Sequence, residues 1–266
     1  MTYLRGAAPN EADRQTRTFR RFSASHNAFF AFIEERFGGS CPERVLELGC
    51  GTGEMAEAMR RRWDCAAEGW DASEEYLSAG RRAYPEVIFR RVPFGRRPLP
   101  KERFGLVIFR EALMEHGRPA DLLSWAARLL RKDGLIAALE PDYSGTMIYP
   151  EIPGWDEFLE KYRKYCLSKG EDFRAGRALL FNFLKAGLRG VQVRPVAETH
   201  TSLDSRKLRD FMEIEAFSVG EDLRLFGKDM GVSRKAAAAL VKALREIPSI
   251  KGAYVQTAMM AACGRR

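Results

Sequence analysis

The sequence is poor in the features that place a protein in a membrane or in a disulfide-stabilised secreted scaffold. Within its 266 residues no apolar run is long enough to span a bilayer, and the N-terminal segment lacks the apolar core of a signal peptide. The five cysteines are odd in number and scattered, and none of them forms a C-x-x-C pair, so the sequence predicts neither a disulfide framework nor a metal site. We therefore expect a cytoplasmic protein with no membrane partner.

Basic residues outnumber acidic ones, but they are dispersed along the chain. The 44 lysines and arginines against 36 aspartates and glutamates give a net charge of +8, and the isoelectric point is about 9.4. Such a charge attracts anionic partners, RNA among them. Because no segment concentrates the basic residues, a solvated arginine-rich surface is the favoured interpretation and a nucleic-acid partner the less favoured one.

A short apolar run followed by three alternating glycines organises the first half of the chain. Residues 44–48 form the run, and Gly49, Gly51 and Gly53 follow before a helical pattern begins. A run of this kind predicts a buried parallel strand, and the glycines allow positive φ and the close approach of a ligand. The next helix would turn its unpaired N–H groups toward that ligand. With Glu47 in front, the spacing Glu-x-Gly-x-Gly-x-Gly differs from the G-x-G-x-x-G of dinucleotide-binding loops.

A further acidic residue follows the next predicted strand. Residues 65–71 read as a strand that ends in Asp71, about twenty residues after the glycines. Ligands of open α/β sheets lie at the carboxyl ends of the strands, where a carboxylate can accept hydrogen bonds from both hydroxyls of a ribose. Capping of the following helix is the alternative role of Asp71, and Ser73 is the expected N-cap. Ribose binding is favoured because the glycine loop accompanies it.

The pattern from Glu47 to Gly53 resembles motif I of the class I S-adenosylmethionine (SAM) methyltransferases. Residues 176–188, which read Gly-Arg-x-Leu…Ala-Gly-Leu, resemble the helix before strand six in the small-molecule members of that family. The resemblance implies an α/β fold, namely a three-layer Rossmann-like domain with a seven-stranded, mostly parallel sheet, an antiparallel last strand and helical cap inserts. It also implies SAM as the cofactor and S-adenosylhomocysteine (SAH) as the product.

Two acids that the family usually carries are replaced in this chain. After the third predicted strand, residues 87–92, the family places an aspartate that binds the adenine amino group, whereas this chain has Pro93 and Phe94. Backbone groups and the apolar face of Phe94 are the candidates to hold the adenine instead. In the fourth predicted strand, residues 104–109, Gly105 stands where the family has aspartate. These two losses keep a non-catalytic protein with a SAM fold among the alternatives.

The resemblance extends to the N-terminal leader. Residues 1–40 carry apolar residues at helical spacing, end in a pair of glycines and contain Arg14 and Gln15 within a Glu-x-x-Arg-Gln sequence. In similar enzymes such a leader folds over the cofactor, and the arginine binds the methionine carboxylate through two N–H donors. The equal alternative is that Arg14 and Gln15 lie on a solvent-exposed face of a helix and contact no cofactor.

Residues after the fourth and fifth predicted strands are expected near the transferred methyl group and the acceptor. His116 is a candidate general base for a hydroxyl acceptor, with packing or helix capping as the favoured alternative. Tyr143 and Tyr149 are candidate acceptor contacts; for Tyr143, as for Glu140 and Asp142, capping of the next segment is an equal alternative. The resemblance implies cofactor contacts from Arg14, Gln15, Glu47, Gly49, Gly51, Gly53, Asp71, Ala72, Phe94, Arg110 and Glu111.

The sequence thus predicts methyl transfer from SAM to a small-molecule acceptor, such as a secondary metabolite, at an O, N or C atom, because helical inserts can wall a closed pocket. Methylation of RNA or protein and a non-catalytic binding role are the alternatives, and no oligomeric state is predicted. One domain is expected over residues 1–266. Its parts are a helical lid at 1–40, a SAM-binding core at 41–145, helical cap inserts at 146–170 and 203–250, and the rest of the core at 171–202 and 251–266.

Overall fold

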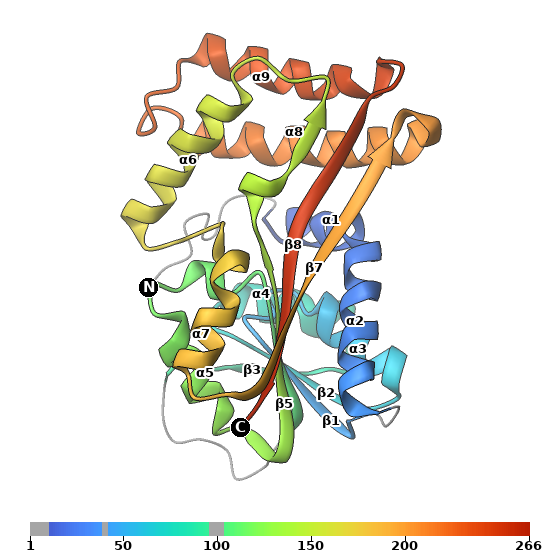
Figure 1. Ribbon diagram of the computed structural model, residues 1–266, viewed down its shortest axis with the longest axis vertical. Coiled ribbons are helices and arrows are strands. Elements are labelled where there is room, and N and C mark those ends of the chain that lie inside the picture. Colours follow the sequence, from blue (N-terminus) through green and yellow to red (C-terminus); the bar gives the residue numbers. More distant parts are fainter. Residues whose placement is uncertain (1–10, 39–41, 96–103) are drawn as a thin grey trace.

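The computed structural model describes residues 11–38, 42–95 and 104–266, which form one mixed sheet flanked by helices (Figure 1). The strands are β1 Arg44–Leu48, β2 Ala66–Asp71, β3 Ile88–Arg91, β4 Phe104–Arg110, β5 Leu130–Pro141, β6 Met147–Tyr149, β7 Arg189–Thr201 and β8 Tyr254–Arg265. Their order is β3-β2-β1-β4-β5-β8-β6, and β7 pairs with the other side of β8. The pairs among β1 to β5 are parallel, whereas β8 is antiparallel to β5, β6 and β7.

Helices cover both faces of the sheet and a separate group lies beyond its end. They are α1 Glu11–Arg21, α2 Ser23–Phe37, α3 Glu54–Trp63, α4 Glu74–Ala83, α5 Pro119–Ala127, α6 Trp155–Lys169, α7 Leu179–Lys185, α8 Ser205–Phe226 and α9 Arg234–Glu246. One apolar cluster joins α2 and α3 to the sheet through Phe29 and Met59, and another joins α5 and α7 to the opposite face through Leu122 and Phe183. Burial of these side chains is the main force that holds the layers together.

The long strands β7 and β8 carry a helical cap. In Figure 1 they rise from the core toward α8 and α9, with α6 on the same side of the molecule. The cap is joined to the N-terminal helices, because Phe22 meets Phe211 edge to face at 6.3 Å and Arg21 forms an ion pair of 2.5 Å with Glu215. Helices α1 and α8 therefore meet above the carboxyl ends of the central strands.

The predicted fold class is confirmed, with local corrections. The leader forms two helices, and Gly38 ends α2 with a left-handed φ of 61° as expected; Gly39 lies outside the described residues. Strand β6 was not predicted, because the prolines beside it favoured an irregular segment, so the sheet has eight strands and not seven. Strand β5 begins at Leu130 and contains a positive φ of 65° at Asp133, which marks an irregular step near the start of the strand. Among the described helices, none combines the length and apolarity needed to cross a membrane.

Candidate cofactor and acceptor site

The loop between β1 and α3 presents backbone N–H groups at the carboxyl end of the sheet. Gly49, Gly51 and Gly53 all have positive φ, at 72°, 52° and 86°. At Gly51 a side chain would also collide with the leader, because an added Cβ would lie 2.3 Å from Oε1 of Gln15. The glycine spacing therefore meets two requirements, a left-handed backbone and a close approach.

Asp71 lies at the end of β2 and holds this loop. Its Oδ2 accepts the N–H of Gly51 at 2.9 Å, and its Oδ1 accepts the N–H of Ser73 at 2.8 Å. Ser73 caps α4 as predicted, since its side chain accepts the N–H of Tyr76. Burial raises the pKa of Asp71, and these N–H donors oppose that shift. Because each carboxylate oxygen can accept a further bond, Asp71 can still bind a pair of ligand hydroxyls. Ala72 lines the cavity beside it.

Glu47 supports the loop from below and does not line the cavity. It is 1% exposed, and its Oε2 accepts the N–H of Ala56 in the first turn of α3 at 2.9 Å. Burial raises the pKa of Glu47 to about 8. The structure thus gives Glu47 a positioning role between β1 and α3. Gly53 also lies outside the cavity lining, at the N-cap of α3.

The first helix lies over the glycine loop. Thr16 donates a hydrogen bond of 2.5 Å to Glu54 at the start of α3, which fixes α1 against the loop. Arg14 and Gln15 both line the cavity, and the Arg14 guanidinium donates to the hydroxyl of Thr18 at 3.3 Å. Both leader residues thus lie at the cavity, next to the glycine loop.

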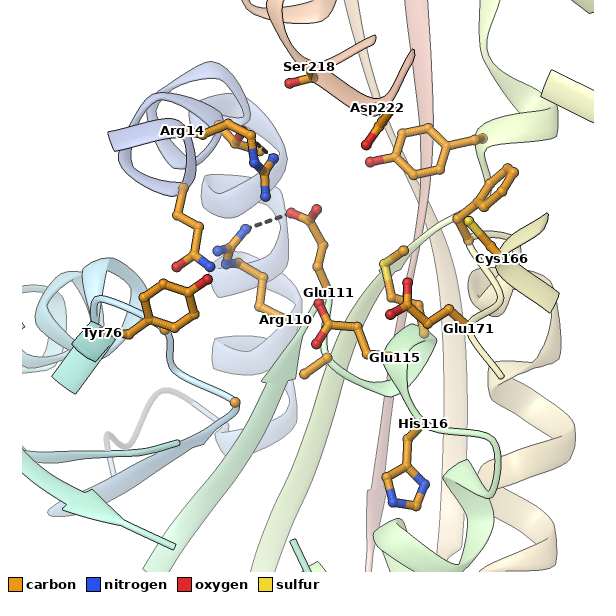
Figure 2. Close-up of a pocket in the computed structure, with 18 of the residues that line it drawn as sticks. Arg14, Tyr76, Arg110, Glu111, Glu115, His116, Cys166, Glu171, Ser218 and Asp222 are labelled. Carbon is orange, nitrogen blue, oxygen red and sulfur yellow. Dashed lines mark hydrogen bonds and ion pairs between the residues drawn. The ribbon is translucent and has the colours of Figure 1, made fainter. Parts of the chain in front are cut away.

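Phe94 and His116 lie together at one side of the cavity. Their rings are 6.2 Å apart, and Phe94 also meets Phe109 at 6.4 Å. The Nδ1 atom of His116 accepts the backbone N–H of Arg118, and burial lowers the pKa of the imidazole. His116 lies well below the group of carboxylates in Figure 2. It therefore lines the cavity beside the expected adenine contact, Phe94.

Arg110 and Glu111 form an ion pair at the end of β4. Arg110 Nη1 lies 2.6 Å from Glu111 Oε1, and Figure 2 shows the pair below Arg14. Glu111 has a φ of 52°. This left-handed region of backbone conformation is common for glycine and asparagine and unfavourable for most other residues. Such strain is common where a side chain must be aimed into a site. Both residues line the cavity.

One cavity of about 710 Å³ joins this loop to the cap. On the cap side its walls come from η1 (Leu113–Glu115), α6, the segment after α6, and α8. Tyr143 lines the cavity, whereas Tyr149 lies outside it, 54% exposed and stacked on Tyr254 at 5.9 Å between ring centroids. A volume of several hundred Å³ is typical of pockets for small ligands.

The structure decides the role of Glu140 and adds residues that the sequence did not single out. Glu140 is fully buried, and its oxygens accept the N–H groups of Ala112, Leu113 and Met114, so it caps η1 and does not face the cavity. Glu115, Glu171 and Asp222 line the cap side and were missed. Glu115 stands next to His116, a signal that was available; no local pattern marks Glu171 or Asp222.

The fold and this loop define an α/β protein built to bind a nucleoside-containing cofactor, and comparison with known proteins narrows the class. Residues 45–134 match the family described as "Methyltransferase domain". Trans-aconitate 2-methyltransferase of Mycobacterium sp. (strain KMS) is 43% identical over 47 residues, which are 17% of this chain and 18% of that protein. The enzyme of the same name from Pseudomonas aeruginosa (strain PAO1) is 28% identical over 151 residues, or 55% of this chain and 53% of that protein.

A solved structure shares the fold over the whole chain. Phosphoethanolamine N-methyltransferase 2 of Haemonchus contortus, in complex with phosphomonomethylethanolamine and SAH, superimposes with a TM-score of 0.56 at 14% identity, covering 100% of this chain and 61% of that one. Residues 45–134 thus carry a methyltransferase domain, and the resemblance to the SAM-dependent methyltransferases is confirmed over these residues, with SAM as the cofactor that it implies. The matches to the trans-aconitate enzymes span from about a fifth to about half of those proteins' length.

Proposed function

We propose that this chain transfers the methyl group of SAM to a small molecule held under α6 and α8. The observation that supports this most directly is the single cavity of about 710 Å³, which reaches from the glycine loop to the cap helices. Both reactants would share one space. A cavity of this volume favours a small acceptor over RNA or a folded protein.

In this proposal the cofactor half positions SAM and supplies no acid or base. Asp71 would bind the ribose hydroxyls, Phe94 would pack on the adenine, and Arg14 would bind the methionine carboxylate while Gln15 covers the glycine loop. The SAM sulfonium supplies an activated methyl group. The chain would contribute mainly by aligning the acceptor with that methyl group, which can replace a large part of the entropic cost of the encounter. His116 stays a proposed base for a hydroxyl acceptor only.

The proposal also assigns roles to the segments around the cavity. Residues 1–40 would act as the lid of the site, and residues 146–170 and 203–250 would act as its cap, within one domain of 266 residues. A cytoplasmic location and an acceptor from secondary metabolism complete the proposal. The curated relatives are named for trans-aconitate. The family match at residues 45–134 ends before α6 and α8 begin, so it does not include these walls of the acceptor half.

Calorimetry and a labelled-methyl assay together test the proposal. SAM and SAH should each bind the full chain with one site, and methyl-labelled SAM should label small acceptors but neither bulk RNA nor protein. Absence of binding by both ligands would favour the non-catalytic alternative. Salt-sensitive RNA binding at micromolar or lower concentration, together with label in RNA, would favour the RNA alternative.

A further inference from the structure

The lining of the cavity is acidic although the protein as a whole is basic. Six carboxylates and four guanidinium groups line it, in a chain whose net charge is +8. Two of these carboxylates form ion pairs with arginines of the lining. Glu111 is paired with Arg110 at 2.6 Å, and Glu215 with Arg21 at 2.5 Å. The guanidinium of Arg21 is therefore neutralised by a carboxylate of the cap helix α8.

Three more carboxylates meet in the cap half from separate elements. Glu115 lies on η1, Glu171 follows α6, and Asp222 lies on α8; Glu171 and Asp222 are 7% and 4% exposed. Figure 2 shows Glu115 and Glu171 across a narrow space, with Asp222 above them and Cys166 at the side. Burial and then the charge of Glu171 raise the pKa of Glu115 well above its usual range, which favours the protonated form of Glu115 until a cation binds beside it. A positive ligand would relieve this repulsion.

An aromatic wall faces the same space and contains an unused donor. Ring contacts run from Trp155 to Phe158 at 5.8 Å, to Tyr162 at 5.6 Å and on to Phe173 at 5.0 Å. Ring faces attract cations. Trp155 is only 8% exposed, and its Nε1–H has no hydrogen-bond partner among the described residues. A buried donor without a partner is costly, so it points to an acceptor atom on the ligand.

We propose that the acceptor is a small organic cation, an amine that is protonated in solution and also carries an oxygen that accepts a hydrogen bond. This inference rests on the proposed function. Glu115, Glu171 and Asp222 would attract the ammonium group, the rings of α6 would pack on it, and Trp155 would donate to the oxygen. A polycarboxylate of the trans-aconitate type would instead meet three carboxylates, because Arg21 is already paired with Glu215.

Methylation of such an amine balances without a further reactant. The ammonium group first gives a proton to one of the lining carboxylates, which frees the nitrogen lone pair. That lone pair forms the new N–C bond while the C–S bond of SAM breaks and its electron pair passes to sulfur. The products are SAH and a methylated ammonium ion, and the carboxylate returns its proton to solvent when the products leave.

Three probes that differ only in charge test the inference. Tyramine, tyrosol and 3-(4-hydroxyphenyl)propionate share one scaffold and end in an ammonium, a hydroxyl and a carboxylate group. Titrated into the SAH-loaded full chain, tyramine should bind at least tenfold more tightly than the other two. Glu171→Gln and Asp222→Asn should each reduce tyramine affinity about tenfold and leave tyrosol unchanged. Glu213→Gln, on an exposed part of α8 paired with Arg245, is the matched control and should change nothing.

The outcomes separate this inference from the function on which it rests. If SAH does not bind, the proposed function fails and the inference falls with it. If SAH binds but the three probes bind equally, or not at all, or the carboxylate probe binds best, only the inference is overturned. Loss of SAM affinity with tyramine affinity intact in Glu171→Gln and Asp222→Asn would assign these carboxylates to the sulfonium and also overturn it. Turnover of trans-aconitate above that of tyramine would do the same.

Discussion

Replacement of Asp71 by alanine tests the cofactor half of the site. In the protein its carboxylate accepts N–H bonds from Gly51 and Ser73 at 2.9 and 2.8 Å, and we expect its remaining lone pairs to accept from the ribose hydroxyls. A hydrogen bond to a charged group contributes about 1.5–3 kcal/mol, so Asp71→Ala should weaken SAM binding by about 10- to 150-fold. Because SAM and SAH share the ribose, the loss should be similar for both.

Calorimetric titration of SAM and SAH into wild type and variant measures this loss. Asp71→Ala also frees the N–H of Gly51 inside the site, so thermal unfolding should accompany each titration to show that the variant is folded. Asp71→Asn, which keeps the shape and loses the charge, should lie between the two. Glu75→Ala changes an exposed carboxylate on the following helix and should leave affinity unchanged. Unaltered affinity of folded Asp71→Ala for both ligands would refute the ribose assignment.

Three further predictions concern the loop, the buried acid and the candidate base. Gly51→Ala should weaken SAM binding, because a φ of 52° disfavours a side chain and the new Cβ, 2.3 Å from Oε1 of Gln15, would displace the Gln15 amide from the loop. Gly231→Ala, with a φ of 67° and open space around it, should reduce stability alone, and equal SAM affinity of the two variants would contradict the close approach. Burial raises the pKa of Glu140 to about 8 from the usual 4.5, so the folded state holds its proton more tightly and wild-type stability should fall as pH rises through that window, by up to about 1.4 kcal/mol per unit. Denaturant unfolding across the window should show a shallower fall in Glu140→Gln; parallel curves would argue against a buried protonated acid. His116→Ala should lower turnover of a hydroxyl acceptor without changing SAM affinity, and a pH–rate profile identical to that of wild type would remove His116 as a base.

The cofactor half could be predicted from the sequence because its signals are local. The apolar run, the glycine spacing and Asp71 lie within 30 residues and correspond to β1, the loop and the end of β2. Even there, spacing did not separate contact from support. Glu47 belongs to the same pattern, yet it is buried and bonded to Ala56, since only the path of α3 decides which way its carboxylate points.

The cap half could not be predicted residue by residue because its members meet only through tertiary packing. Trp155 and Asp222 come from segments that the pattern predicts as helical inserts, and Glu171 directly follows the first insert, but helical periodicity does not say which face of a helix lines a cavity. Tyr149 is a residue that the sequence predicts at the acceptor and the structure places elsewhere. It lies on strand β6, which was not predicted, and its ring stacks on Tyr254 outside the cavity.

The division between the two halves also explains why family membership does not fix the acceptor. The family match ends at residue 134, so it includes the glycine loop and Asp71 but neither α6 nor α8. In the proposed acceptor half, the charge comes from Glu115, which the match includes, and from Glu171 and Asp222, which it does not. A SAM-binding half of this kind can be combined with a cap that is lined by either negative or positive side chains, because methyl transfer requires only that the acceptor atom be aligned with the methyl group on the sulfonium. Arg21 shows how the sign is fixed here: its guanidinium, which would otherwise favour an anion, is bound by Glu215 from the same helix that carries Asp222.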